Sequence, residues 1–143
     1  MIGGASLFMK AIAMTETTKD DTASSQPRTI IATFDGSCIG NPGPGGYGAV
    51  LREPATCKRR PIKGAVEEPK TTNNRAELRA AIAALTKIKE GASVTMRGDS
   101  NYVVRGATEW LPRWRERGWR GADRKPVANR DLWEALTFAV ARH

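Results

Sequence analysis

The chain has few thiols and almost no histidine. Its 143 residues include two cysteines, Cys38 and Cys57, and one histidine, His143. Two thiols in a chain long enough to bury its own core do not indicate a disulfide framework, and a reducing cytoplasm is the simplest setting. No apolar run reaches the roughly 18 residues of a membrane span, and no basic stretch precedes the mildly apolar start. We therefore expect a cytoplasmic protein without a membrane or secretion segment.

Acidic residues are scarce relative to basic ones, 15 against 23, which gives a formal net charge of +8. The excess lies entirely after Arg28, because the first 28 residues hold three bases and three acids. A basic surface attracts nucleic acid, so we expect a polyanionic partner. Residues 15–27 are rich in Thr, Ser and Asp. We expect residues 1–28 to be a disordered leader and residues 29–143 to be one domain.

The residue pattern changes from strand-like to helical along the chain. It predicts three strands joined as an antiparallel meander, at 29–34, 46–52 and between 59 and 66. The segment 36–46, dense in Gly and Pro, is expected to be a loop. Apolar residues with helical spacing follow over 73–89, and a strand over 93–97. Three further helices are predicted at 102–107, 110–117 and 129–142.

Three acidic residues stand out: Asp35 after the first strand, Glu77 in the first turn of the first helix, and Asp99 after the fourth strand. If the fourth strand lies parallel to the first, its end places Asp99 beside Asp35. Oxygen ligands without nearby Cys or His suit Mg²⁺ or Mn²⁺. Each residue alone has a structural explanation. Asp35 lies in an ordinary turn sequence, Glu77 can close a capping box that begins at Asn74, and Asp99, Ser100 or Asn101 can cap the next helix.

Four longer segments make the pattern specific: 35–49, 71–78, 98–103, and the Trp- and Arg-rich stretch 110–133. In these the chain closely resembles the bacterial type 1 ribonuclease H family, and the resemblance covers residues 29–143. It implies an α/β ribonuclease H-like fold, with a mixed five-stranded sheet of three antiparallel strands plus parallel strands, flanked by helices. The last strand and helix of that fold are missing from this chain. The implied activity is hydrolysis of the RNA strand of RNA–DNA hybrids, leaving 5′-phosphate and 3′-hydroxyl ends.

The resemblance also implies roles for the carboxylates. Asp35 would bridge two Mg²⁺ ions, which Mn²⁺ can replace, and Glu77 and Asp99 would bind the ion on the leaving-group side. Two such ions activate water and stabilise the departing oxygen, so no protein nucleophile is required. The family's fourth catalytic Asp and its mobile histidine lie beyond the matched region, and His143 does not match the latter. We therefore expect slow cleavage at best, supported better by Mn²⁺ than by Mg²⁺.

Hybrid recognition needs groups that detect the ribose 2′-hydroxyl. By resemblance, the residues that line the minor groove are Gly36, Cys38, Asn41, Asn73, Asn74 and Asn101, the last standing where Gln is more familiar. Thr72 and Arg75 match a contact to DNA phosphate. The basic segment resembles a protrusion that grips the DNA strand, with contacts from Trp110, Arg113, Trp114, Arg117, Trp119 and Arg120. A solvated basic helix with its Trp side chains in the core is the alternative.

Two other functions remain open. The first is a non-catalytic or weakly active hybrid-binding module, which the missing fourth carboxylate favours. The second is a recombinase-type nuclease of the same fold, which the uninterrupted glycine loop and the basic segment argue against. In each case the expected partner is a nucleic acid duplex and the expected state is a monomer.

Overall fold

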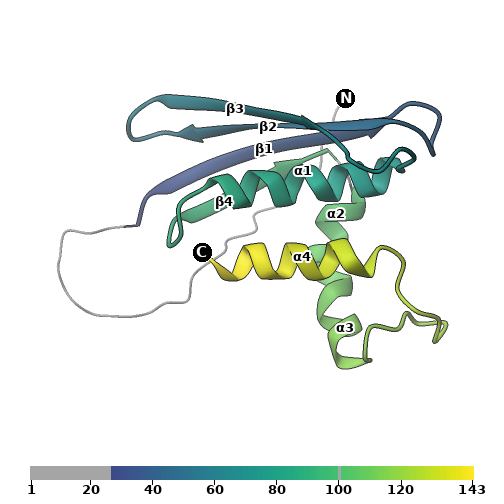
Figure 1. Cartoon of the computed structure of the whole chain (residues 1–143). Coiled ribbons are helices and arrows are strands. Elements are labelled where there is room, and N and C mark those ends of the chain that lie inside the picture. The colour runs from purple at the N-terminus through teal and green to yellow at the C-terminus, as the bar shows by residue number, and fades with distance from the viewer. Residues whose placement is uncertain (1–26, 100) are drawn as a thin grey trace.

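A computed structural model of the protein describes residues 27–99 and 101–143. The elements are β1 (Thr29–Cys38), β2 (Gly45–Glu53), β3 (Lys58–Ala65), α1 (Asn73–Lys87), β4 (Ser93–Gly98), α2 (Asn101–Arg105), the π-helical turn η1 (Gly106–Trp110), α3 (Leu111–Glu116) and α4 (Arg130–Ala141) (Figure 1). The expected leader, apart from Pro27 and Arg28, and the candidate cap Ser100 lie outside the described residues.

The sheet is mixed, as predicted. Its strand order is β3-β2-β1-β4. β1 pairs antiparallel with β2, β2 pairs antiparallel with β3, and β4 runs parallel to β1. The crossover from β3 to β4 passes through α1, as a parallel connection requires. The described residues therefore contain the three-stranded meander and one parallel strand of the predicted sheet.

The expected loop over 36–46 was too long at both ends. β1 continues to Cys38 and β2 begins at Gly45, and these two residues are partners in the antiparallel register. Glycine has low strand propensity, but that propensity is weak compared with pairing to a neighbouring strand. The Gly-rich ends therefore join the sheet, and the loop is limited to the few residues between them.

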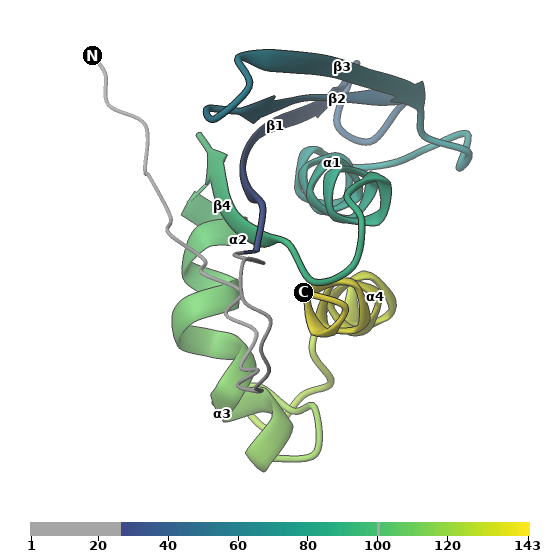
Figure 2. The same ribbon diagram turned by 90° about the vertical axis from the view of Figure 1, so that its left-hand side faces the viewer.

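The core lies between the sheet and two helices. α1 covers one face of the sheet, and α4 packs beside α1 on the side away from the sheet (Figure 2). Phe34, Val94, Leu78 and Leu85 are buried between these layers, and Trp133 of α4 is fully buried. The prediction that Trp133 belongs to the core is confirmed. None of the helices in the described part of the chain is both long and apolar enough to span a membrane.

One continuous helical arm stands where two separate helices were predicted. α2, η1 and α3 follow each other without a break, and η1 is a single π-helical turn. Gly106 lies at the start of this turn against the indole of Trp133, and a Cβ on Gly106 would clash with that ring. A single π-helical turn changes the direction of the side chains that follow it, and this lets a helix fit against a packed neighbour. The arm is therefore shaped by Trp133, which is 27 residues away in the sequence.

We expect Gly106→Ala to lower the free energy of unfolding by about 1–3 kcal/mol, because overpacking a rigid core is destabilising. Alanine is the better helix former by about 1 kcal/mol, so propensity alone predicts the opposite sign. Urea denaturation measures the change. In a Trp133→Phe background the smaller ring should make the same substitution less costly. An equal or greater loss in that background would mean that the ring of Trp133 does not set the packing at Gly106.

Candidate active site

β1 and β4 bring two of the predicted carboxylates to one edge of the sheet. In the parallel register Phe34 lies opposite Gly98. Asp35 is the next residue of β1 and Asp99 directly follows the end of β4, and both are exposed. Asp99 therefore lies beside Asp35 as predicted, but Asp35 lies within β1 and not after its end.

The third carboxylate reaches the same place through a close contact between β1 and α1. A Cβ on Gly36 would clash with the carbonyl oxygen of Ala76, so only glycine allows the strand to approach the helix this closely. The contact sets Glu77 beside Asp35, close enough for the charge of Asp35 to act on the Glu77 carboxyl. Glu77 is the fifth residue of α1. It therefore lies just past the first turn, in which it was predicted to lie.

Glu77 is the electrostatically unusual member of the group. Burial raises the pKa of Glu77 to about 7, and the nearby charge and hydrogen bond of Asp35 act in the same direction. Asp99 adds a smaller repulsion, and the backbone N–H of Gly36 acts in the opposite direction. Glu77 Oε2 is buried and has no hydrogen-bond partner among the described residues. A carboxyl in this environment gains stability from a proton or from a bound cation.

The donor set fits a hard divalent cation. All three side chains offer carboxylate oxygens, and the unpartnered Glu77 Oε2 is the kind of buried polar atom that a ligand would satisfy. Within residues 27–99 and 101–143, however, no three or more His, Cys, Asp or Glu side chains already form a metal-binding group. Asp35, Glu77 and Asp99 thus converge on one place without forming a closed cage.

The glycine-rich loop is tied to the start of α1 by amide groups. The Cys38 N–H donates to Asn73 Oδ1 over 3.0 Å, and the Asn73 N–H donates to Asn41 Oδ1 over 3.0 Å. Gly43 and Thr71 exchange two backbone hydrogen bonds of 2.9 and 2.8 Å. The side-chain oxygens of both asparagines are therefore engaged, which leaves their NH₂ groups as donors at the surface.

The other predicted groove residues differ in exposure. Asn74 and Asn101 are exposed at the starts of α1 and α2, whereas Gly36 is buried at the contact between β1 and α1. Whether these residues contact a ribose stays a prediction.

Thr72, and not Asn74, caps α1. The Thr72 hydroxyl accepts a hydrogen bond from the Arg75 N–H over 3.2 Å. The interpretation of residues 74–77 as a capping box was therefore wrong. The N-cap is Thr72, which has an extended backbone and lies two residues before the predicted cap Asn74. Glu77 therefore has no capping role.

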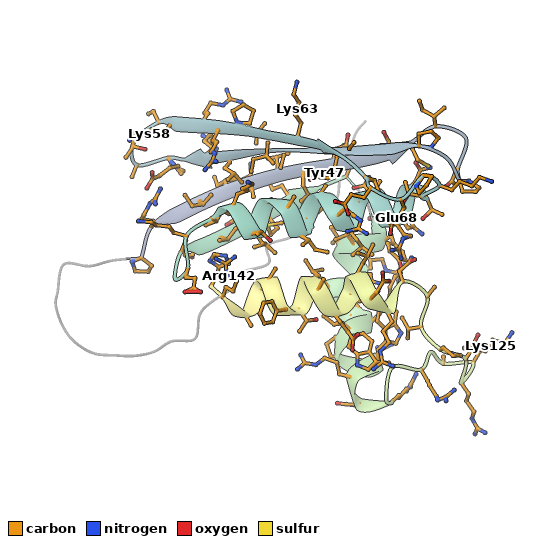
Figure 3. All side chains as sticks on the ribbon, in the orientation of Figure 1. Tyr47, Lys58, Lys63, Glu68, Lys125 and Arg142 are labelled. Carbon is orange, nitrogen blue, oxygen red and sulfur yellow. The ribbon has the colours of Figure 1, made fainter. Side chains whose placement is uncertain are left out.

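The guanidinium of Arg75 is held by acidic neighbours. It lies 2.6 Å from Glu68 and makes two hydrogen bonds to Asp131, of 3.0 and 2.9 Å, and one of 3.2 Å to Asn129 Oδ1. Glu68 lies in the segment that leads into α1 (Figure 3). Sequence reasoning missed this network, because Asp131 is 56 residues from Arg75 and no local pattern links them. The predicted phosphate contact of Arg75 stays untested.

Three of the four tryptophans form one aromatic cluster with Tyr102. The ring of Trp114 lies 5.3 Å from that of Trp133 and 5.9 Å from that of Trp110, and Tyr102 contacts both Trp110 and Trp133. The Trp133 indole N–H donates to the Tyr102 hydroxyl over 3.0 Å. Packing of this kind stiffens the arm and positions the side chains that point outward from it.

The basic residues of the arm and of the loop after it point to solvent. Arg113, Arg117 and Arg120 are exposed. Arg117, Arg120 and Arg124 line a cavity of about 360 Å³, and Lys125 lies at the outer tip of the loop (Figure 3). The remaining predicted contact, Trp119, is half-buried beneath the guanidinium of Arg130, 5.3 Å from its ring centre. The segment thus combines packed rings with free cations.

Comparisons with known proteins identify the family of this chain. The sequence profile of the RNase H family matches residues 27–143. Ribonuclease H of Vibrio campbellii is 54% identical over 109 residues, which cover 76% of this chain and 68% of that protein. The crystal structure of RNase H1 from Halobacterium salinarum is 28% identical, with a TM-score of 0.52, over 79% of this chain and 76% of that one.

A further solved structure shares the fold. LC11-RNase H1, solved in complex with an RNA/DNA hybrid, is 24% identical, with a TM-score of 0.54, over 77% of this chain and 75% of that one. At that identity the likeness concerns the fold alone. The extent of the family match and the identity to the bacterial relative are decisive, and this chain belongs to the ribonuclease H family of enzymes.

Proposed function

We propose that this chain binds RNA–DNA hybrids and hydrolyses their RNA strand, leaving 5′-phosphate and 3′-hydroxyl ends. The observation that carries the proposal is the convergence of Asp35, Glu77 and Asp99 at one sheet edge, with a buried and unpartnered oxygen on Glu77. Family membership supports it, as does the shared fold with LC11-RNase H1, whose solved complex contains an RNA/DNA hybrid.

Asp35, Glu77 and Asp99 would hold divalent metal ions, Mg²⁺ or Mn²⁺, which when bound activate a water molecule and stabilise the departing oxygen. Glu77 must first lose its proton, since only the carboxylate is a good ligand. Its pKa of about 7 makes that loss depend on pH close to neutrality. Asp35 is exposed beside Glu77, so its carboxylate is open to a cation.

The amide cluster supplies the means to distinguish RNA from DNA. Asn41 and Asn73 are fixed through their side-chain oxygens, so their NH₂ groups are oriented before substrate arrives. Such donors suit the 2′-hydroxyl of a ribose, which accepts as well as donates. The exposed arginines of the arm would hold phosphates of the DNA strand and thereby set the register of the duplex.

A hybrid-binding module without catalysis is the second candidate. It is favoured because, in the described part of the chain, no three Asp, Glu, His or Cys side chains are grouped closely enough to hold a metal ion. Both candidates predict hybrid binding, and only the first predicts cleavage that depends on Asp35.

We expect Asp35→Asn to abolish metal-dependent cleavage of a hybrid, because the amide cannot neutralise cations. Binding should be retained or slightly improved without metal, since a negative charge near the phosphates is removed. Gel-based cleavage assays and fluorescence anisotropy measure the two effects. Glu90→Gln, the same carboxylate-to-amide change beyond the other end of α1, should leave both unchanged. Wild-type cleavage by the Asp35→Asn protein would exclude the proposed role.

The raised pKa of Glu77 predicts a stability that depends on pH. The pKa of the folded state, about 7, exceeds the ordinary value of 4.5. The proton on Glu77 therefore stabilises the fold fully below pH 4.5, and this contribution is lost as pH rises through 7. The shift corresponds to roughly 3 kcal/mol, and solvent screening of a half-buried group leaves about 1–2 kcal/mol.

In metal-free buffer, Glu77→Gln should remove this fall in the free energy of unfolding between pH 5 and pH 8, whereas Glu67→Gln, at an exposed site, should retain it. Thermal or urea unfolding at a series of pH values measures the difference. Identical pH profiles for the wild type and Glu77→Gln would show that Glu77 is not destabilised by its surroundings.

Neutralising Arg113, Arg117 and Arg120 together should weaken hybrid binding and reduce its salt dependence. Each phosphate contact contributes roughly 0.9 to the slope of log K against log salt, so three contacts give a reduction of about 2 to 3. Anisotropy titrations at several salt concentrations measure the slope. As a control, the same loss of charge at Arg52, Arg59 and Lys63, all exposed on the sheet, should change the slope by much less. Equal slopes for the arm variant and the wild type would mean that the arm does not touch phosphate.

A further inference from the structure

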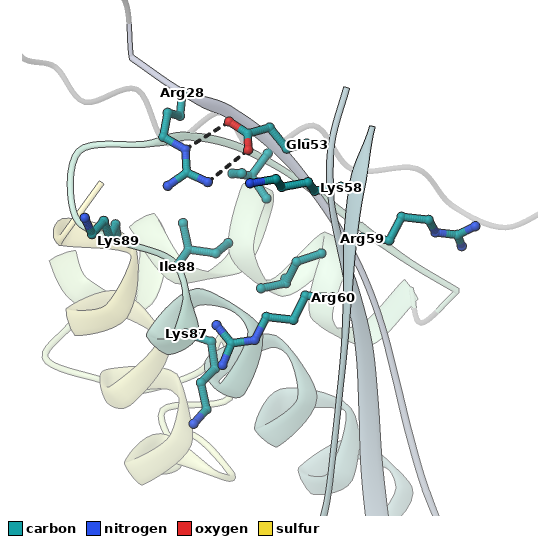
Figure 4. A pocket seen from close by; sticks show the side chains of 10 residues that line it. Arg28, Glu53, Lys58, Arg59, Arg60, Lys87, Ile88 and Lys89 are labelled. Carbon is teal, nitrogen blue, oxygen red and sulfur yellow. Dashed lines mark hydrogen bonds and ion pairs between the residues drawn. The ribbon is translucent and has the colours of Figure 1, made fainter. Parts of the chain in front are cut away.

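A second cavity lies at the end of the sheet opposite the carboxylates (Figure 4). Its volume is about 750 Å³, and it is lined by the starts of β1 and β3, the end of β2 and the C-terminal end of α1. Ile30 in its floor and Asp35 are five residues apart on β1, which is about 16 Å along a strand. The cavity is therefore separate from the candidate active site, and what it binds does not depend on the proposed hydrolysis.

The rim of this cavity is strongly basic. Six cationic residues from three parts of the chain line it. Five of them form its rim, Arg28, Lys58, Arg60, Lys87 and Lys89, and the sixth is Arg59. In Figure 4 the Arg60 side chain points across the cavity toward Lys87, whereas the Arg59 side chain points away on the other side of the strand. This alternation is the ordinary property of a strand. Arg60 therefore faces the cavity, whereas the side chain of Arg59, which carries the same charge, does not.

The single carboxylate at the rim is already engaged. Glu53 accepts two hydrogen bonds from the Arg28 guanidinium, of 2.9 and 3.0 Å, and a third from the Thr56 hydroxyl over 3.1 Å. The hydrogen bond from Arg28 holds the pKa of Glu53 below its usual value, so the pair stays charged. None of the other four rim cations forms an ion pair among the described residues, although the charge of Lys58 also helps to lower the pKa of Glu53. The cavity therefore keeps an excess of positive charge that a ligand can neutralise.

The floor is apolar and lies deeper than the charges. Ile30, Leu51 and Ile88 line the cavity and are only 5–7% exposed. A phosphate backbone that crosses a surface needs only the cations and gains nothing from such a floor. A cavity of several hundred Å³ with apolar lining and a few charged groups is typical of a small-molecule site. The ligand that fits has a compact apolar body and several negative charges.

We propose that this cavity binds a nucleoside di- or triphosphate. The base would lie over Ile30, Leu51 and Ile88, and the phosphate chain would lie among the four rim cations that form no ion pair. Lys87 and Arg60 carry most of the specificity for the phosphates, because their side chains approach each other across the opening.

Isothermal titration of ATP into the full chain tests the proposal, with EDTA present so that the carboxylate site holds no metal. Arg60→Ala combined with Lys87→Ala should weaken ATP binding by about tenfold or more, since two charge-assisted contacts to the phosphates are lost. The matched control is Arg52→Ala with Lys63→Ala, which removes the same charge from β2 and β3 at positions that do not line the cavity. Lys63 points away from α1 (Figure 3). The control should weaken binding by less than about twofold, and both double variants should cleave hybrid as the wild type does.

Two further probes distinguish a nucleotide from a ligand that is recognised by its phosphates alone and from a nucleic acid strand. Tripolyphosphate should bind at least about threefold more weakly than ATP, because it cannot use the apolar floor. A single-stranded DNA oligomer should not displace ATP from the cavity. Lack of ATP binding, equal losses in the two double variants, equal affinity for tripolyphosphate, or displacement by the oligomer would each overturn the proposal. All four substituted side chains are exposed, and thermal unfolding of each variant verifies that it folds.

Discussion

The close approach of β1 to the start of α1 is the constraint on which the candidate site depends. It requires glycine at position 36, because any Cβ there would meet the Ala76 carbonyl. Three consequences follow from this one backbone contact. Glu77 lies beside Asp35, its carboxyl is partly removed from water, and its pKa rises. A looser contact would leave three exposed acids with ordinary chemistry, so the electrostatic character of the site is set by backbone packing.

Such a site costs stability, and the rest of the fold must offset that cost. Two neighbouring carboxylates repel each other, and an unpartnered buried oxygen forfeits hydrogen bonds to water. The compensation is found in the packed layers behind the site. The indole of Trp133 is fully buried against Gly106 and bonded to Tyr102, and Arg75 binds the start of α1 to α4 through Asp131. Local destabilisation at the carboxylates is thus tolerated because the two helices behind them cannot separate easily.

Much of this arrangement could be predicted from the sequence, and the exceptions share a physical cause. Apolar periodicity located α1 and β4, and the order of elements was enough to expect Asp99 beside Asp35. The π-helical turn, the strand character of Gly45 and the partners of Arg75 could not be found in this way. Each of them depends on a contact with another segment of the chain, whereas propensity and spacing report only on residues within one segment.

Two sites of opposite charge lie at the two ends of α1. The carboxylates gather near its N-terminal end, and Lys87 lies in its last turn beside the basic cavity. The helix dipole favours this distribution, most directly at Lys87, since its effect fades beyond the terminal turn. Glu77 and Lys87 are ten residues apart on α1, or about 15 Å, which exceeds the Debye length of about 8 Å at physiological salt. The net charge of +8 is therefore not spread evenly over the surface, and different parts of the protein attract polyanions to different extents. The basic cavity and the carboxylate site can be occupied without strong mutual influence, and each can be altered by mutation while the other is kept intact.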